Sequence, residues 1–323
     1  MKRYLGFIIL GIAFSCNSPK PPSMDSAASE SVPENLKGSF SISGAYALYP
    51  LVNHLAEQFM AVHPDVKIEV TRVSSGEGLA DLLSGNCHLA MISRALTDEE
   101  TTAGIWVIPL AKDGVAPVVN QRNPNIQKIL DQGISPDEFM QVFTSGKQMT
   151  WGEILASDSK DKISVLTREE GAGASDVWAS FLYKKASDLK GRIVEGDEEM
   201  IRRIQEDPLA LGFCNFSYAF DVASGERKED IQIVPCDLDF DDKIDRVEVP
   251  FRTLEEGHRS LWLGFYPDLL CRELTIGSMG KPSDPVIVEF LRYALGDGQA
   301  EVKKSGYCPL NNVYLQYARN SLK

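Results

Sequence analysis

The sequence predicts an α/β protein with a parallel sheet in its first domain. Residues 39–92 alternate between short apolar strands and amphipathic helices, in the order strand, helix, strand, helix, strand. Such a run sets its strands parallel, with turns at their carboxyl ends, where open α/β sheets bind ligands. The chain has 323 residues, of which 43% are hydrophobic, so it can bury cores in two domains.

Each element of this run has its own signal. The first helix is predicted by apolar residues at helical spacing: Leu51, Leu55, Phe59 and Val62. The next strand alternates from Val66 to Val70, and a turn at Ser74 to Gly76 opens a second helix. An apolar strand over 89–92 ends the run.

The elements after residue 96 predict a second domain. Two short apolar strands on either side of Asp113 would form the crossover into it, and a capped helix begins at Ser135. A strand over 231–234 could lead the chain back to the first domain. The C-terminal region predicts two more helices.

Residues 1–16 are typical of a bacterial lipoprotein signal peptide. A basic start precedes an apolar run over 4–14, which is shorter than the roughly 20 residues that span a bilayer. Ser15 followed by Cys16 resembles a lipobox, although Ala13 stands where Leu is usual, and a plain signal peptide cut elsewhere is the alternative. We expect Cys16 to be lipidated and residues 17–37, rich in Ser, Pro and Glu, to form a flexible tether. The protein would be exported and anchored to an envelope membrane on its periplasmic side.

Charge and cysteine content exclude several classes of protein. The formal net charge is −13 and no basic patch occurs, which argues against nucleic-acid binding. An acidic protein that binds an anion must rely on local dipoles and a few arginines. Five cysteines follow Cys16 without a CxxC pair, which argues against a thioredoxin-like site or a zinc ribbon. Disulfides and buried free thiols both remain open.

The segment ISVLTREEGAGASDVW, residues 163–178, predicts an anion cradle. An apolar strand ends at Arg168, and a Gly-x-Gly turn then opens a helix. Gly171 and Gly173 allow close backbone approach, the helix N-terminus adds partial positive charge, and arginine offers a bidentate fork. A lone Gly-x-Gly is a weak signal, and an ordinary strand-to-helix turn with a surface arginine gives the same pattern.

Eight collinear segments resemble a known family. They are ISGAYALYPLV, VSSGEGLADLLSG, ISRALTDEE, KDGVAPVVN, FMQVFTSGKQMTWGEI, TREEGAGASDVW, DPLALGFCNFSY and SGYCPL. Together they resemble the phosphate-binding lipoproteins of the PstS type, which deliver phosphate to an ABC importer and belong to the periplasmic-binding-protein superfamily. The resemblance implies a two-lobed, type II periplasmic-binding-protein fold with the ligand cleft between the lobes. Lobe 1 would comprise residues 38–110 and 236–323, and lobe 2 residues 111–235.

The resemblance also implies a binding function without catalysis. The expected partners are inorganic phosphate or a similar oxyanion and ABC permease subunits, with the membrane reached only through the lipid anchor. The protein would be a monomer without a cofactor. Absence of GxSxG, HExxH and Walker motifs also argues against an exported hydrolase.

Family contacts can be transferred to this sequence by position. The implied phosphate-binding positions are Ala47, Leu48, Tyr49, Ser74, Arg94, Arg168, Ala172, Gly173 and Ala174. Supporting roles are implied for Ser75, Glu170 and Ser175. Arg94 matches a position that is Asp in some members and Arg in others.

Three positions depart from the family pattern. Leu48, Ala172 and Ala174 stand where hydroxyl side chains are usual. A hydrogen bond to a charged group contributes about 1.5–3 kcal/mol, so their loss would weaken phosphate binding strongly. Ser75, Ser175, Tyr46 or a second arginine could replace them. Otherwise the ligand is another oxyanion, or the protein is a ligand-free surface or sensory interaction protein of the same fold.

An acidic stretch over 237–248 resembles a calcium loop. Carboxylates occupy its positions one, three, five, nine and twelve: Asp237, Asp239, Asp241, Asp245 and Glu248. Position six requires Gly but carries Asp242. We therefore expect a solvated acidic loop without a metal ion.

Overall fold

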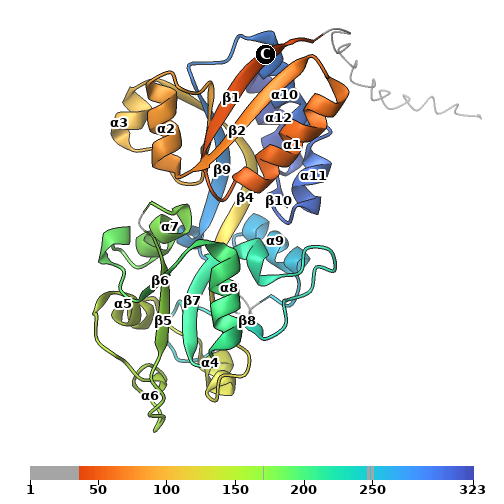
Figure 1. The fold of residues 1–323 in the computed structure, drawn as a ribbon. Helices are drawn as coiled ribbons and strands as arrows, with labels where there is room; N and C mark the ends of the chain where they lie inside the picture. The colour runs from red at the N-terminus through yellow and green to blue at the C-terminus, as the bar shows by residue number, and fades with distance from the viewer. Residues whose placement is uncertain (1–35, 170, 246–247, 249–250) are drawn as a thin grey trace, which may run out of the picture. The chain divides into compact units, whose positions relative to one another are not determined.

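The predicted βαβαβ run forms a parallel sheet. The computed structural model describes residues 36–169, 171–245, 248 and 251–323. Strand β1 (Gly38–Ala45) lies between β2 (Val66–Val73) and β3 (Leu89–Ile92) and pairs with both in parallel. The helices α1 (Tyr49–Val62) and α2 (Ser75–Leu83) connect these strands, as the periodicity predicts (Figure 1).

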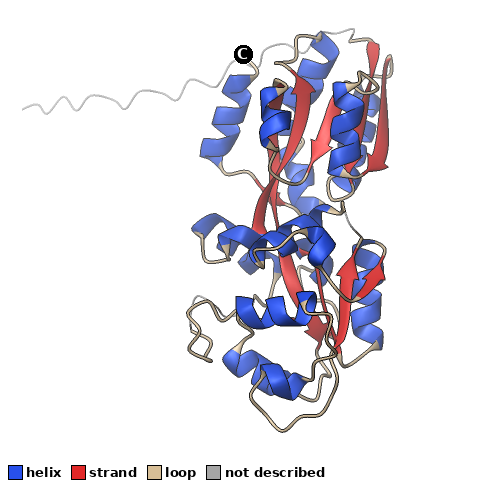
Figure 2. Cartoon of the chain, turned by 90° about the vertical axis from the view of Figure 1, so that its left-hand side faces the viewer, coloured by secondary structure: helices blue, strands red, loops and turns tan. Residues whose placement is uncertain are grey.

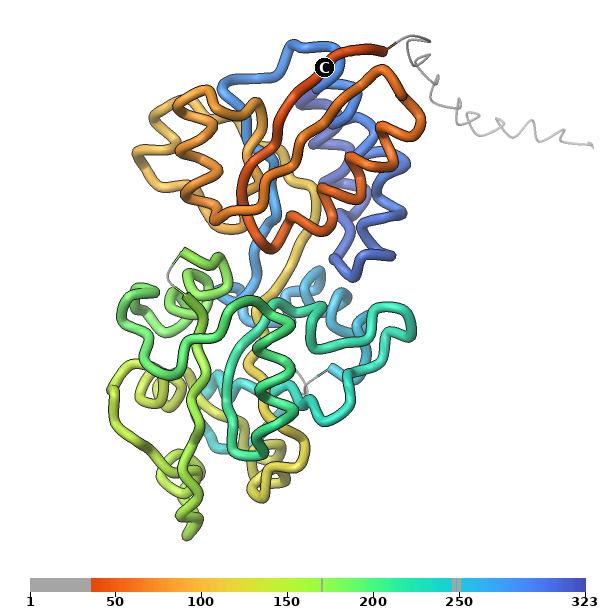
Figure 3. Tube along the Cα trace, in the orientation of Figure 1, coloured from red at the N-terminus to blue at the C-terminus, as the bar shows by residue number. Residues whose placement is uncertain are grey.

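The first hydrophobic core joins the N-terminal strands to the C-terminal helices. Phe40 of β1 and Phe59 of α1 each place their ring 5.5 Å from that of Phe290 in α10 (Pro285–Leu295). Figure 3 shows the red and orange N-terminal trace beside the blue C-terminal trace. The remaining elements at this end are α3 (Asp98–Thr102), α11 (Gln299–Lys304) and α12 (Asn312–Ser321). Residues more than 200 positions apart in sequence therefore share one core.

The second core surrounds Trp178 of α7 (Gly173–Phe181). Its indole stacks on Phe213 at 5.2 Å and meets Phe139 and Phe143 edge-on at 5.0 and 5.2 Å. The strands here are β5 (Ser164–Arg168), β6 (Arg192–Val194) and β7 (Ala210–Asn215), paired in parallel through β5. Helices, blue in Figure 2, lie beside the red strands. Those near β5, β6 and β7, labelled in Figure 1, are α4 (Ile126–Gln132), α5 (Pro136–Thr144), α6 (Trp151–Ile154) and α8 (Gly196–Glu206).

Two antiparallel strands connect the two cores. They are β4 (Ile105–Asn120) and β9 (Cys271–Met279). The first half of β4 pairs with β9, and its second half pairs with β7 and β8 (Ile231–Ile233). The short strand β10 (Cys308–Pro309) also pairs with β4. The prediction of two short strands around Asp113 is wrong, because one strand of 16 residues continues through it with a bulge between Pro109 and Ala111.

The chain returns to the first core later than expected. The expected boundary was residue 236, but Leu254, Leu261 and Leu270 all pack in the second core. They belong to α9 (Leu254–Leu263) and η3 (Asp268–Leu270). First-core packing resumes at Leu274 in β9. The structure therefore differs from the expected boundary, because β8 pairs with the second-lobe half of β4 and does not lead back.

The predicted signal peptide, Cys16 and nearly all of the predicted tether lie outside the described residues. Leu36, inside the predicted tether, is buried in the first core. Among the described helices, none is long and apolar enough to span a membrane. The five cysteines after Cys16 are all free thiols in the structure.

Candidate functional site

Arg168 carries a buried positive charge at the carboxyl end of β5. Its side chain is 3% exposed, and its Nη1 lies 3.0 Å from Oδ1 of Asp197, in the first turn of α8. Its Nε and Nη2 donate to Glu169 at 3.4 and 3.3 Å. Burial acts to lower the pKa of Arg168, but the carboxylates of Asp197 and Glu169 outweigh it and raise that pKa. The guanidinium therefore stays charged.

The N-terminus of α7 follows directly after this arginine. The amides of Gly173 and Ala174 belong to its first turn, which has no intrahelical acceptors and carries the positive end of the helix dipole. The amide of Ala172 and the hydroxyl of Ser175 both donate to the carbonyl of Glu169, at 3.3 and 3.0 Å. Ser175 thus holds the turn in shape. Glu170, the expected supporting carboxylate, lies outside the described residues.

The N-terminus of α2 forms a second cluster of donors. Ser74 caps the helix: its Oγ accepts from the amide of Glu77 at 3.1 Å, and its own amide donates to Glu77 Oε2 at 2.9 Å. Hydrogen bonds from the Ser74 amide and from its hydroxyl lower the pKa of Glu77. Ser75 Oγ accepts from the amide of Ser93 at 3.1 Å and lies 3.2 Å from its hydroxyl.

These two helix N-termini meet at Ser93. A Cβ added to Gly173 would lie only 2.2 Å from Ser93 Oγ. A Cβ added to Gly171 would lie 3.9 Å from Cβ of Ser74. The two predicted anion-binding turns therefore lie next to each other on either side of Ser93, and glycine at position 173 is required by that approach.

The turn before α1 contributes less than expected. Leu48 has no exposed surface because its side chain packs in the first core, and its amide donates to the carbonyl of Ala45 at 2.9 Å. The carbonyl of Ala47 accepts from the hydroxyl of Tyr307 at 2.7 Å. Tyr49, the first residue of α1, keeps a first-turn amide.

Arg72 was not foreseen at this turn. It is exposed, and its guanidinium carbon lies 5.3 and 5.9 Å from the ring centroids of Tyr46 and Tyr49. Cation–π contacts of this kind hold a positive charge on an aromatic surface. Its position at the end of β2 is the one feature of the sequence that could have indicated a role for Arg72 at this turn.

Arg94 is close to α2 but is already paired. Its two terminal nitrogens donate to the two carboxylate oxygens of Glu100, both at 2.8 Å, and Nη1 also donates to the carbonyl of Ala95. The hydrogen bond from Arg94 lowers the pKa of Glu100. A Cβ added to Gly76 would lie 4.0 Å from Arg94 Nη2. Arg94 thus lies beside the donor cluster, with most of its donors occupied.

A buried polar network beside the site was missed in the sequence. Arg272 on β9 donates through Nη2 to Asp113 on β4, at 2.9 Å, and to Asn215 Oδ1. Asn215 in turn donates its amide and side chain to Asp197, both at 2.8 Å. Burial raises the pKa of Asp113, and the charge of Arg272 opposes that rise. The sequence feature that could have indicated this network is a charged residue inside each of two apolar strands.

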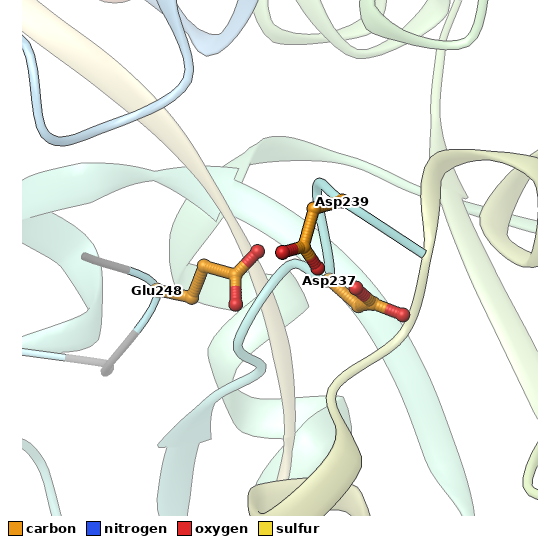
Figure 4. A group of neighbouring side chains, drawn as sticks. All are labelled: Asp237, Asp239 and Glu248. Atoms are coloured by element: carbon orange, nitrogen blue, oxygen red, sulfur yellow. The ribbon is translucent and has the colours of Figure 1, made fainter. Parts of the chain in front are cut away.

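The acidic loop does not join this site. Oxygens of Asp237, Asp239 and Glu248 lie within 4.8 Å of one another (Figure 4). Asp237 accepts from three amides of the loop, and Glu248 accepts from the amide of Leu238 at 2.7 Å. Asp242 adopts a φ of 58°, the conformation that favours glycine at position six. Asp237 and Glu248 thus stabilise the loop by accepting hydrogen bonds from its own backbone amides.

Comparison with known proteins identifies the family. A model described as a PBP superfamily domain matches residues 29–250. The phosphate-binding protein PstS of Bacillus subtilis strain 168 is 31% identical over 219 residues, which cover 65% of this chain and 68% of that protein. This chain is a PstS-type member of the PBP superfamily.

Two solved structures share the fold of this PstS-type protein. One is an ABC-type phosphate transport receptor from Vibrio cholerae, with a TM-score of 0.65 and 22% identity over 83% of this chain and 98% of that chain. The other is a Clostridium perfringens substrate-binding protein with bound phosphate, with a TM-score of 0.65 and 23% identity over 85% of this chain and 100% of that chain. Both confirm the two-lobed architecture.

Proposed function

We propose that this PstS-type protein is an exported, lipid-anchored receptor that captures inorganic phosphate between two lobes and passes it to an ABC permease. The observation that carries the proposal is the contact of two helix N-termini beside the buried guanidinium of Arg168. Helix N-termini bind anions through free amides and the helix dipole, and arginine adds a charge-assisted fork. Phosphate is the ligand in the names of the relatives.

The anion would be held by groups from both lobes. Arg168 neutralises its charge, and the amides of Gly173 and Ala174 donate from the second lobe. From the first lobe would come the hydroxyl of Ser74, turned from the Glu77 carboxylate to the anion, and the backbone amides of Ala47 and Tyr49. Leu48 and Ala172 shape the two turns, because their amides donate to neighbouring carbonyls. Arg94 adds positive charge at the edge of the site.

Lobe closure would occur through β4 and β9. Gly173 belongs to a helix of the second core, whereas Ser93 follows β3 in the first lobe. Their contact is the place where closing lobes would meet. Closure removes water from the site and so strengthens each hydrogen bond to the anion.

Calorimetry on the full chain in detergent tests the receptor function. We expect phosphate to bind more tightly than sulfate, arsenate or molybdate, and Arg168→Gln to weaken that binding at least hundredfold. Arg122→Gln removes the same charge from an exposed site and should leave the affinity unchanged. Absence of binding heat for all four anions, in protein that melts cooperatively, would reject the proposal.

Two further measurements test its other parts. Metabolic labelling with palmitate should mark the wild type and fail for Cys16→Ser if the chain is lipid-anchored.

The buried, hydroxyl-free side chains of Leu48, Ala172 and Ala174 favour a second candidate function, that of a ligand-free interaction protein with the same fold. A melting temperature that none of the four oxyanions raises would favour that candidate.

A further inference from the structure

We propose that Arg272 is a second guanidinium of the anion site, acting beside Arg168; this inference rests on the proposed receptor function. Arg272 lies on β9, far in sequence from every turn that the family resemblance implicates. It would supply the donors that Leu48, Ala172 and Ala174 lack.

Arg272 lies where the two helix N-termini meet. Its Nη1 donates to the carbonyl of Ser93 at 3.3 Å, and a Cβ added to Gly173 would lie 3.0 Å from the same nitrogen. Ser93 in turn contacts Ser75, the first residue of α2. The guanidinium is therefore in contact with the turn after β3 and with the first residue of α7.

One buried donor of Arg272 has no acceptor. Within the part of the chain that the structure describes, Nε of Arg272 makes no hydrogen bond, and its side chain is 4% exposed. Buried donors on charged groups are costly to leave unpaired. A tetrahedral oxyanion offers several acceptor oxygens, so one of them could pair with this nitrogen while others contact Arg168.

The network fixes both arginines in position. Contacts run from Arg272 through Asn215 to Asp197 and then to Arg168. Each guanidinium thus has one buried carboxylate as a neighbour, Asp113 for Arg272 and Asp197 for Arg168. Arginines held by such partners are preorganised, so that little side-chain entropy is lost when an anion binds.

The competing interpretation is that Arg272 only neutralises Asp113. Calorimetry with phosphate separates the two roles, using the full chain in detergent. The deciding variant is Asp113→Asn with Arg272→Met, which removes both charges of the pair and leaves no unpaired buried charge. We expect its phosphate Kd to rise at least tenfold, whereas Arg272→Lys alone should retain part of the lost affinity. A double variant that melts cooperatively and binds within twofold of the wild type would overturn the inference.

A single substitution decides the question if the double variant does not fold. Asp113→Asn alone removes the carboxylate that neutralises Arg272. The positive charge of Arg272 then attracts the anion more strongly, so the phosphate Kd should fall at least threefold. An unchanged or higher Kd would overturn the inference. Arg122→Gln again controls for the general loss of charge.

Failure of the inference can be told apart from failure of the receptor function. If the wild type binds sulfate, arsenate or molybdate instead of phosphate, the same variants are compared with that anion. If the wild type binds one anion and the double variant binds it equally well, only the role of Arg272 is rejected. If the wild type binds none of the four, both proposals are rejected.

Discussion

Gly173→Ala is the substitution that most directly tests whether the two helix N-termini meet around a ligand. The added methyl group would lie 2.2 Å from Ser93 Oγ, and real Cβ contacts stay beyond 3.0 Å. One of the two must therefore move by roughly 0.8 Å (3.0 − 2.2). Ser93 is 1% exposed and in contact with Ser75, so it has little room to yield.

The expected effect falls on ligand binding. Overpacking a filled site costs about 1–3 kcal/mol. If the contact forms only when the lobes close, this cost raises the phosphate Kd by roughly 5- to 150-fold. It leaves the stability of the ligand-free protein nearly unchanged, because each lobe keeps its own core.

The assay is a double-mutant cycle with Ser93→Ala. Removal of Oγ leaves Ser93 Cβ as the nearest atom of that side chain, 3.4 Å from the new methyl group. The double variant should therefore recover most of the affinity lost in Gly173→Ala, with a coupling of at least 1 kcal/mol. Calorimetry gives the Kd values, and thermal melts without phosphate show that folding is intact. Wild-type affinity in Gly173→Ala would refute the reasoning.

Three further predictions concern other parts of the molecule. Arg94→Gln should weaken phosphate binding less than Arg168→Gln, because Glu100 already occupies its fork; equal losses in calorimetry would contradict this. Burial lowers the pKa of His258 from 6.5 to about 4. The contribution of neutral His258 to the free energy of unfolding is therefore complete above pH 6.5. It declines by up to about 3 kcal/mol as the pH falls to 4. The difference in unfolding free energy between wild type and His258→Gln should shrink accordingly, and a constant difference would be inconsistent with it. Native protein at pH 8 should react slowly with a thiol reagent and denatured protein rapidly, because burial raises the pKa of three thiols to about 12: Cys236, Cys271 and Cys308. Rapid reaction of any one of them in the native state would rule out its burial.

Local sequence signals predicted the parts of the fold that depend on local structure. Helix α1 followed from apolar spacing, and the cap expected at Ser135 forms with a full capping box. Arg168 was identified from its place between an apolar strand and a Gly-x-Gly turn. Each of these signals lies within about ten residues.

The errors concern contacts between distant residues. Lys112-Asp113-Gly114 is typical of a turn, yet Asp113 is buried against Arg272, 159 positions later. The Gly114 backbone packs closely too, because an added Cβ would lie 3.2 Å from Leu261. No local pattern shows that a polar stretch will be covered by another strand. For the same reason, the sequence did not indicate that Asp197 is the partner of Arg168.

If the lobes close as we propose, the paired strands β4 and β9 limit how they can move. A pair of loops would let the lobes swing freely, but a hydrogen-bonded ribbon resists bending and returns to its resting curvature. Motion should therefore be small, elastic and reversible, with no hydrogen bonds to break. The bulge between Pro109 and Ala111 interrupts the ladder and marks the place where the ribbon bends most easily. In the proposed closure, elastic energy stored in the bent ribbon would help to release the ligand.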